Sequence, residues 1–272
     1  MTDTPQTQSV LAAFERDAAA SAVLGTAERF AEIANATVEG VHAGTSLPGT
    51  LATLTRRAGV TLRLVPGPPD RGLLAELERP GVRAIVIGAG HEHRGRHPAG
   101  PTTRYVAERS TKPVVVVPID GEGVHGELRR LLVPLEGTES SSRPILEALL
   151  PLLVEGVEVE VLHVFTDETV PRMLDRPVRD TELLGREFLA RHCPPAGRIV
   201  LHAGAVADRV QEVAEEHEAG MVVLSWSQDS SEGRARVVRE VLATSQRPVL
   251  LLPVARDVGR MALPGPPVRV PL

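Results

Sequence analysis

The sequence repeats itself, and this repeat limits what the chain can fold into. The segment from Ser110 to Pro118 and the segment from Ser245 to Pro253 share one pattern: a polar turn, a proline and four apolar residues before a final proline. The second segment lies 135 residues after the first. Upstream, Val41-His42 is matched by Leu162-His163. Self-similarity at this spacing indicates a duplicated domain, so each copy serves as an internal control for the other.

Length and composition fit two soluble domains. A chain of 272 residues is long enough for two domains that each bury a core. The net charge of −5 gives no electrostatic attraction to nucleic acid or anionic lipid. No apolar run approaches the roughly 20 residues that span a bilayer, and the first residues contain no signal-like segment. We therefore expect a cytoplasmic protein that binds neither nucleic acid nor membranes.

In both copies, short apolar runs alternate with segments whose apolar residues have helical spacing. In the first copy we predict strands over residues 10–14, 37–42, 60–65, 82–87 and 114–117, and helices over 18–34, 51–58, 72–77 and 102–109. In the second we predict strands over 131–135, 158–164, 198–202, 221–224 and 249–252, and helices over 143–154, 181–190, 206–217 and 235–242. Regular alternation of this kind predicts an α/β fold with doubly wound parallel sheets.

Domain boundaries follow from the same pattern. We predict a flexible N-terminus over residues 1–8, a first domain over 9–119 and a second over 129–254. The glycines and charges of residues 120–128 are typical of an exposed linker. Residues 255–272 form a proline-rich tail, and its prolines exclude a regular helix.

A glycine-rich loop follows the strand predicted over 82–87. Ligands of parallel sheets bind beyond the carboxyl ends of the strands, and this loop runs from Gly88 and Gly90 to Gly100, where a helix begins. Glycines let a bound group approach the backbone, and free N–H groups at a helix start attract anions. The loop is not a dinucleotide fingerprint, because His93 stands where the third glycine would fall, and no Gly-Lys-Ser/Thr of a P-loop follows.

The strand-then-glycine loop, the strand–helix order and the run from Lys112 to Pro118 resemble the universal stress protein family of the UspA type, over nearly all of residues 9–254. Family members that bind ATP carry Gly, two residues, Gly, nine residues, Gly and then Ser or Thr. Here Gly90 and Gly100 keep the nine-residue spacing, Gly88 stands one residue too close, and Pro101 precedes the hydroxyl residue Thr102.

This resemblance implies two flavodoxin-like domains of the adenine nucleotide alpha hydrolase type. It also implies that they pack as an internal pseudo-dimer, in which the last strand of each copy, residues 114–117 and 249–254, meets the other along its edge.

The resemblance further implies a site for ATP or another adenine nucleotide in the first copy, with no metal other than a nucleotide-bound Mg²⁺. The candidate residues are Glu15, Gly88, Gly90, Gly100, Thr102 and Thr103. Family members place an aspartate after the first strand, where this chain has Glu15 and, in the second copy, Glu136. The alternative for these polar segments is capping of the following helices, for example by Asp17 or Thr138.

The second copy has lost the glycines. Ser225 and Ala235 take their places, and Trp226, Asp229 and Glu232 add bulk and negative charge where a polyphosphate would approach. We expect a degenerate site on a solvent-exposed loop; recruitment of a smaller anion by Arg234 and Arg236 is the alternative.

Other reactive side chains suggest no further chemistry. We interpret the loop histidines His91, His93 and His97 as solvated, because a structural zinc site needs four well-placed ligands. The single cysteine, Cys193, is interpreted as a buried, unreactive thiol, and His42 and His163 as packing residues at strand ends. No nucleophile elbow or comparable catalytic motif is present.

The function predicted on this basis is a regulatory or binding role in a universal stress protein, with an adenine nucleotide bound in the first copy only and no enzymatic activity. Two alternatives stay open: a nucleotide-independent scaffold for an unspecified protein partner, and, more weakly, slow ATP hydrolysis. A homodimer is compatible with the sequence.

Overall fold

The computed structural model describes residues 8–15, 17–90, 99–118, 123–124, 126–137, 139–154, 156–165, 178–193, 196–229 and 235–254. The first half contains β1 (Ser9–Phe14), α1 (Asp17–Ile33), β2 (Thr37–Ala43), α2 (Gly49–Arg57), β3 (Thr61–Val65), α3 (Pro69–Leu77), β4 (Val82–Gly88), α4 (Pro101–Arg109) and β5 (Val114–Val117). The second half contains β6 (Arg130–Pro134), α5 (Glu139–Leu149), a 3₁₀ turn η1 (Leu150–Leu152), β7 (Glu158–Phe165), α6 (Val178–His192), β8 (Arg198–Ala203), α7 (Val206–Glu216), β9 (Met221–Trp226), α8 (Arg236–Thr244) and β10 (Val249–Pro253).

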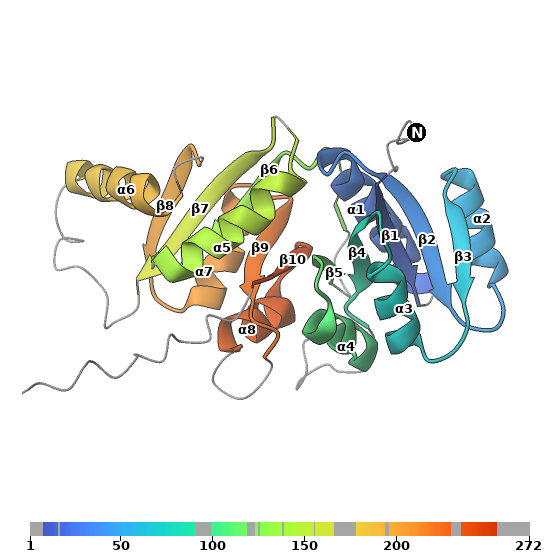
Figure 1. Ribbon diagram of the computed structural model, residues 1–272. Helices are drawn as coiled ribbons and strands as arrows, with labels where there is room; N and C mark the ends of the chain where they lie inside the picture. Colours follow the sequence, from blue (N-terminus) through green and yellow to red (C-terminus); the bar gives the residue numbers. More distant parts are fainter. Residues whose placement is uncertain are drawn as a thin grey trace, which may run out of the picture.

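The strands form one sheet in the order β3-β2-β1-β4-β5-β10-β9-β6-β7-β8. Neighbouring strands within each half are parallel, and the order of the first half is repeated in the second. The halves join where β5 pairs with β10 in antiparallel fashion, with Val115 opposite Leu250. Figure 1 shows this pair at the centre of the molecule. The predicted α/β fold and the pairing of the last strands are confirmed, and the pairing covers an edge that each half would otherwise expose.

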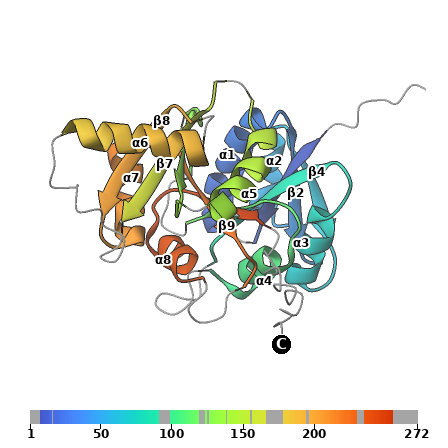
Figure 2. The same ribbon diagram turned by 60° about the vertical axis from the view of Figure 1, so that its left-hand side comes forward.

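Helices cover both faces of the sheet (Figure 2). Because successive residues of a strand point to opposite faces, β1 sends Val10, Ala12 and Phe14 into one core and Leu11 and Ala13 into the other. The first core contains buried residues of α1, α2 and α5, with partly buried residues of α6 packed against it, and the second contains buried residues of α3, α4, α7 and α8. Strands covered on both faces explain why the central strands read as continuous apolar runs.

Part of the predicted linker is buried, and the predicted N-terminal segment is described only at Gln8. In the described part of the linker, Val124 and Leu128 are buried in the first core, and the N–H of Val124 donates to Thr26 Oγ1 at 3.2 Å. Val124 therefore packs against α1, whereas Gly126 and Glu127 are exposed, so the segment is an exposed joint only in part. Gln8, predicted as part of a flexible end, accepts a hydrogen bond from the N–H of Thr37 at 2.9 Å. Residues 1–7 and the tail from 255 lie outside the described residues.

The helix predicted over 143–154 is shorter than expected. It begins earlier, at Glu139, and gives way after Leu149 to the 3₁₀ turn. Pro151 explains the change, because proline lacks the N–H that would continue the helical hydrogen bonding. Val154 instead donates its N–H to the Ile33 carbonyl at the end of α1, 2.8 Å away. The early end of α5 thus lets the second half contact the first.

Candidate functional site

The candidate site lies at the carboxyl ends of β1 and β4. The chain passes from β1 to β2 on one side and returns to β4 on the other, so the winding reverses between β1 and β4. Ligands of open parallel sheets bind at this reversal. A cavity of about 90 Å³ opens there, lined by Ala13, Phe14, Glu15, Ala19, Ala20, Val23, Gly88, Ala89, Gly90, Gly100, Pro101, Thr102, Thr103 and Val117.

All six residues predicted for the nucleotide site line this one cavity. Their elements differ: Glu15 follows β1, Gly88 ends β4, and Gly100 to Thr103 form the start of α4. The cavity is smaller than the roughly 300–1,000 Å³ of typical small-molecule pockets, so in this conformation it accommodates part of a ligand. Residues 91–98, which connect Gly90 to Ala99, lie outside the described residues, and so do the three loop histidines.

Two of the glycines meet at the floor of the cavity. Gly90 has a φ of +84°, which glycine adopts without the strain that a side chain would bring. A Cβ atom on Gly90 would lie 3.3 Å from the Cα of Gly100, and the N–H of Gly100 donates to the Ala89 carbonyl at 2.6 Å. Gly88 is less constrained, because a Cβ there would meet Ala19 and Val23 at ordinary distances of 3.7 and 3.8 Å.

The start of α4 has the character of an anion site. Gly100 is the N-cap and supplies no side-chain cap, and Pro101 has no N–H, so the N–H groups of Thr102 and Thr103 have no acceptor within the helix. Such groups, together with the helix dipole, favour a negatively charged group. The buried Thr103 hydroxyl donates to the Gly88 carbonyl at 2.8 Å and ties α4 to β4. Half-buried Thr102 contributes the other hydroxyl of the wall.

Glu15 places a carboxylate beside the glycines. Its side chain is exposed, and Oε2 lies 4.0 Å from the position that a Cβ on Gly90 would occupy. A carboxylate accepts hydrogen bonds from hydroxyl groups and repels phosphate. The preceding residue is held by His42, whose Nδ1 lies 2.8 Å from the Phe14 carbonyl. The prediction of His42 as a strand-end residue is confirmed, and the buried ring fixes the point from which Glu15 extends.

The loop after β9 corrects the interpretation of the second half. β9 extends two residues beyond its predicted end, and Trp226 is part of it. The indole packs in the second core, and its Nε1–H donates to the Ala107 carbonyl of α4 at 2.7 Å. Gln228 donates to the Ser110 carbonyl. Trp226 is buried and residues 227–229 are half-buried, so the described part of this loop, which contacts the first half through these two hydrogen bonds, is only partly exposed to solvent.

Two other residues predicted at this loop, Ala235 and Arg236, are described. Arg236 lies in α8 near Glu240, with 3.8 Å between nitrogen and oxygen. Ala235, which stands at the position of Gly100, is buried. Glu232 and Arg234 lie outside the described residues, as does the capping candidate Thr138.

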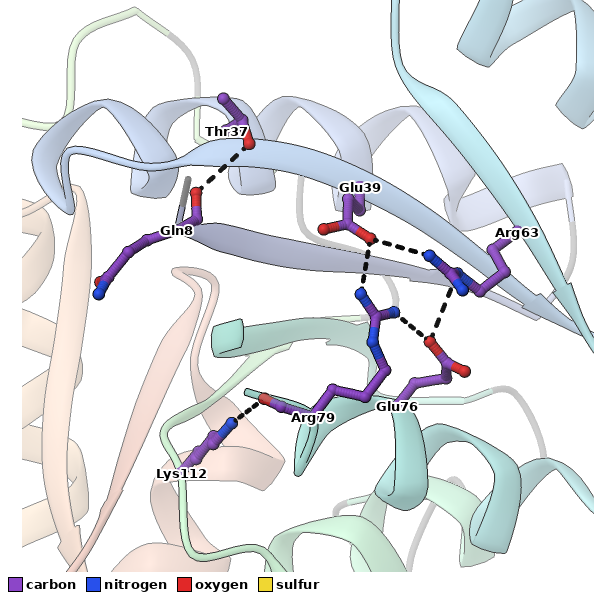
Figure 3. Close-up of polar contacts among 7 residues, drawn as sticks. All are labelled: Gln8, Thr37, Glu39, Arg63, Glu76, Arg79 and Lys112. Carbon is purple, nitrogen blue, oxygen red and sulfur yellow. Dashed lines mark hydrogen bonds and ion pairs between the residues drawn. The ribbon is translucent and has the colours of Figure 1, made fainter. Parts of the chain in front are cut away.

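A charged cluster occupies a different part of the first half (Figure 3). Glu39 of β2 lies 3.2 Å from Arg79 and 3.7 Å from Arg63, and both arginines also pair with Glu76 of α3. Burial alone would raise the pKa of the Glu39 carboxyl, but hydrogen bonds from Ser9 and Arg79 and the charges of Arg79 and Arg63 hold that pKa below its usual value. This cluster contributes no residue to the cavity lining.

The interpretation of the single cysteine as a buried thiol is confirmed. Cys193 is fully buried, and burial raises the pKa of its thiol, which makes the reactive thiolate scarce.

Among the described residues, no group of three His, Cys, Asp or Glu side chains could hold a metal ion. None of the helices in that part of the chain is long and apolar enough to cross a membrane.

Solved structures share this architecture. A protein from Pseudomonas aeruginosa assigned to the universal stress proteins is 14% identical, with a TM-score of 0.65 over 91% of this chain and 94% of its own. A universal stress protein from Archaeoglobus fulgidus is also 14% identical, with a TM-score of 0.58 over 93% of this chain and 98% of its own. At this identity the likeness shows the fold alone. No curated protein matches the chain.

The sequence comparison gives the family directly. Residues 17–118 and residues 127–253 each match the universal stress protein family. The two matches cover both halves of the sheet except β1, as the duplication requires. The chain therefore belongs to the universal stress protein family and carries two copies of its domain.

Proposed function

We propose that the chain is a regulatory binding protein whose first half binds an adenine nucleotide in the cavity between β1 and β4. One observation carries the proposal: the six residues chosen from the sequence come from three separate segments, yet all of them line one cavity. That cavity lies where the winding of the sheet reverses, the usual ligand position in this class of fold.

The chemistry of the wall suggests how a nucleotide would lie. A phosphate would accept hydrogen bonds from the N–H groups of Thr102 and Thr103 at the start of α4. The absence of a side chain at Gly90 would let it approach the backbone. Glu15 would accept a hydrogen bond from a ribose hydroxyl, since its carboxylate suits a hydroxyl and opposes a phosphate. Pro101 removes one N–H that other residues would supply there, so we expect weaker phosphate binding than a fully matching loop would give.

Any Mg²⁺ would arrive with the nucleotide. The described residues offer no cluster of three metal ligands, and Mg²⁺ commonly keeps several waters while it contacts phosphates. We assign no catalytic step to the site, and the proposed role is binding.

The homodimer left open by the sequence would need another surface, because β5 and β10 already pair within the chain.

Calorimetric titration of the full chain with ATP, ADP and AMP, with and without Mg²⁺, tests the proposal. The informative variant is Gly100→Asp. The N-cap φ of −63° and ψ of 166° suit aspartate, a favoured N-cap residue, so α4 should persist. The new carboxylate would take the N–H groups that a phosphate needs and would repel the phosphate. We expect affinity to fall by at least about tenfold, equivalent to roughly 1.4 kcal/mol.

Gly49→Asp is the matched control. It makes the same change at the start of α2, where a Cβ would meet no atom within 4 Å, and it should leave the affinity unchanged. Equal binding by wild type and Gly100→Asp would remove this cavity as the site. No heat and no thermal shift with any of the three nucleotides would contradict nucleotide binding and favour a nucleotide-independent scaffold.

A further inference from the structure

The helix that forms the wall of the cavity is held at its far end by the second half of the chain. α4 begins at the cavity and ends at Arg109, and the last carbonyl groups of any helix lack partners within it. Ala107 in the last turn and Ser110, the C-cap, each accept a hydrogen bond here, from Trp226 and Gln228 respectively. Both donors follow or end β9, more than a hundred residues further along the chain.

The contact is built into the core and is not a surface encounter. Trp226 is only 6% exposed and belongs to the second core, together with Ala107. Its Nε1–H to Ala107 distance of 2.7 Å is that of a well-formed hydrogen bond. Burial of an indole N–H without a partner would be costly, so the position of Trp226 depends on α4, and that of α4 on Trp226.

The backbone at Gln228 supports the same conclusion. Its φ is +61°, a left-handed conformation that is uncommon for a residue with a side chain. Such conformations persist where the surrounding structure enforces them. Here the turn directs the Gln228 amide to the end of α4.

The two halves are not equivalent in this respect. The residue of the first half that stands where Trp226 stands in the second is Ala89, and a methyl group cannot donate a hydrogen bond. The indole contact therefore runs in one direction, from the half without the glycines to the half with the cavity.

We infer that Trp226 and Gln228 are positioning residues for the cavity: by binding the last turn of α4, the second half fixes the first turn, where the N–H groups of Thr102 and Thr103 form the anion-binding wall. At the other end of α4, the Thr103 hydroxyl binds the Gly88 carbonyl of β4. The helix is thus fastened at both ends, and a nine-residue helix transmits a shift of one end to the other. This inference rests on the proposed function for its ligand.

Trp226→Phe is the decisive variant, because it removes the donor and keeps an aromatic ring in the core. Its control is His163→Leu, which removes a buried 2.8 Å contact to Leu135 in the same half without touching α4. Hydrogen exchange of residues 102–109 is measured without ligand. Trp226→Phe should speed exchange of these amides about fivefold, as expected for one lost hydrogen bond, and His163→Leu should not.

Nucleotide affinity is the second measurement. Trp226→Phe should weaken binding of ATP or AMP three- to tenfold. His163→Leu should leave the affinity unchanged, even when denaturant unfolding gives the two variants the same stability. Because Trp226 is the single tryptophan, its fluorescence in the wild type should change on nucleotide addition with the dissociation constant found by calorimetry. A contact that only stabilises the fold would give no such signal, and Gly100→Asp should abolish it.

The outcomes separate the two proposals. Unchanged α4 exchange in Trp226→Phe overturns the positioning role, whatever binds. Faster exchange with an unchanged nucleotide affinity also overturns it, because the cavity would then be independent of the second half. If the wild type binds no nucleotide, the proposed function fails by itself, and the exchange of residues 102–109 alone decides whether the second half holds the wall.

Discussion

The two halves of the molecule keep the same supporting contacts and differ where a ligand would bind. His42 and His163 each hold the carbonyl that ends the first strand of their half, with Nδ1 2.8 Å from Phe14 and from Leu135. The hydroxyl groups of Ser110 and Ser245 each donate a hydrogen bond to the carbonyl of the residue two positions later, at 2.7 and 2.8 Å. Contacts that hold the fold were retained in both copies, whereas the segments after β4 and β9 became a cavity and an interface.

Charged residues show a second difference between the halves. Glu39 and Glu160 occupy the same position, three residues before the strand-end histidine. Glu39 is 28% exposed and lies beside two arginines. Glu160 is completely buried; its Oε1 lies 2.9 Å from His217 and 3.5 Å from Arg198, and its Oε2 has no hydrogen-bond partner within the described structure. One strand position thus holds a partly exposed carboxylate in one half and a fully buried one in the other.

The largest expected effect comes from removing the partner of the buried carboxylate. His217→Ala should lower the free energy of unfolding by about 3 kcal/mol, because it leaves a fully buried carboxylate without its closest partner. Arg79→Ala, the corresponding change in the first half, should cost about 1 kcal/mol or less, since water and Arg63 still reach Glu39. Urea unfolding of both variants measures the difference. Equal losses would show that burial does not distinguish the two glutamates.

The strand-end histidines should behave alike. His42→Leu and His163→Leu each remove one buried hydrogen bond and replace the ring by an apolar side chain that still fills the site. Each should lower the free energy of unfolding by about 1–1.5 kcal/mol. The double variant should show the sum to within about 0.5 kcal/mol, because the two sites share no partner. A loss confined to one of the two single variants, measured by urea unfolding, would contradict a contact of equal importance in both halves.

The smallest effect concerns the pH dependence of the Glu39 cluster. Because the pKa of Glu39 is lower in the folded protein than its ordinary value of 4.5, its contribution is present above that value and is lost as the pH falls through the folded pKa. Wild type should therefore exceed Glu39→Gln in unfolding free energy by less than about 1 kcal/mol at pH 7, and this excess should shrink between about pH 5 and pH 3. An excess that is constant over this range would exclude the carboxylate as its source.

Local patterns predicted most of the fold, and together with the family resemblance they predicted the residues of the candidate site. The β-strands fall within two residues of their predicted bounds because each is an apolar run between turns. Gly88, Gly90 and Gly100 could be chosen because their loop follows an apolar strand and resembles the glycine loop of the universal stress protein family. The end of α5 could also have been found from the sequence, since Pro151 signals it.

Trp226 and two linker residues, Val124 and Leu128, were wrongly expected to be exposed, and the reason is shared. Trp226 precedes a polar segment, and Val124 and Leu128 lie in a glycine-rich one; such segments are typical of exposed loops. The burial of Trp226 depends on Ala107 of the other half, and that of Val124 on Thr26 of α1. A pattern read within a short window contains no information on a surface that arrives from a hundred residues away.

The sequence by itself determined that the chain holds two copies of one α/β domain and that only the first keeps the glycines after its fourth strand, because periodicity and glycine placement act through the local backbone. The tertiary structure decided what the second copy does with its altered loop. Pairing of β5 with β10 brings α4 against β9, and this contact turns Trp226 from an apparent obstacle to phosphate into the hydrogen-bond donor that holds the end of α4.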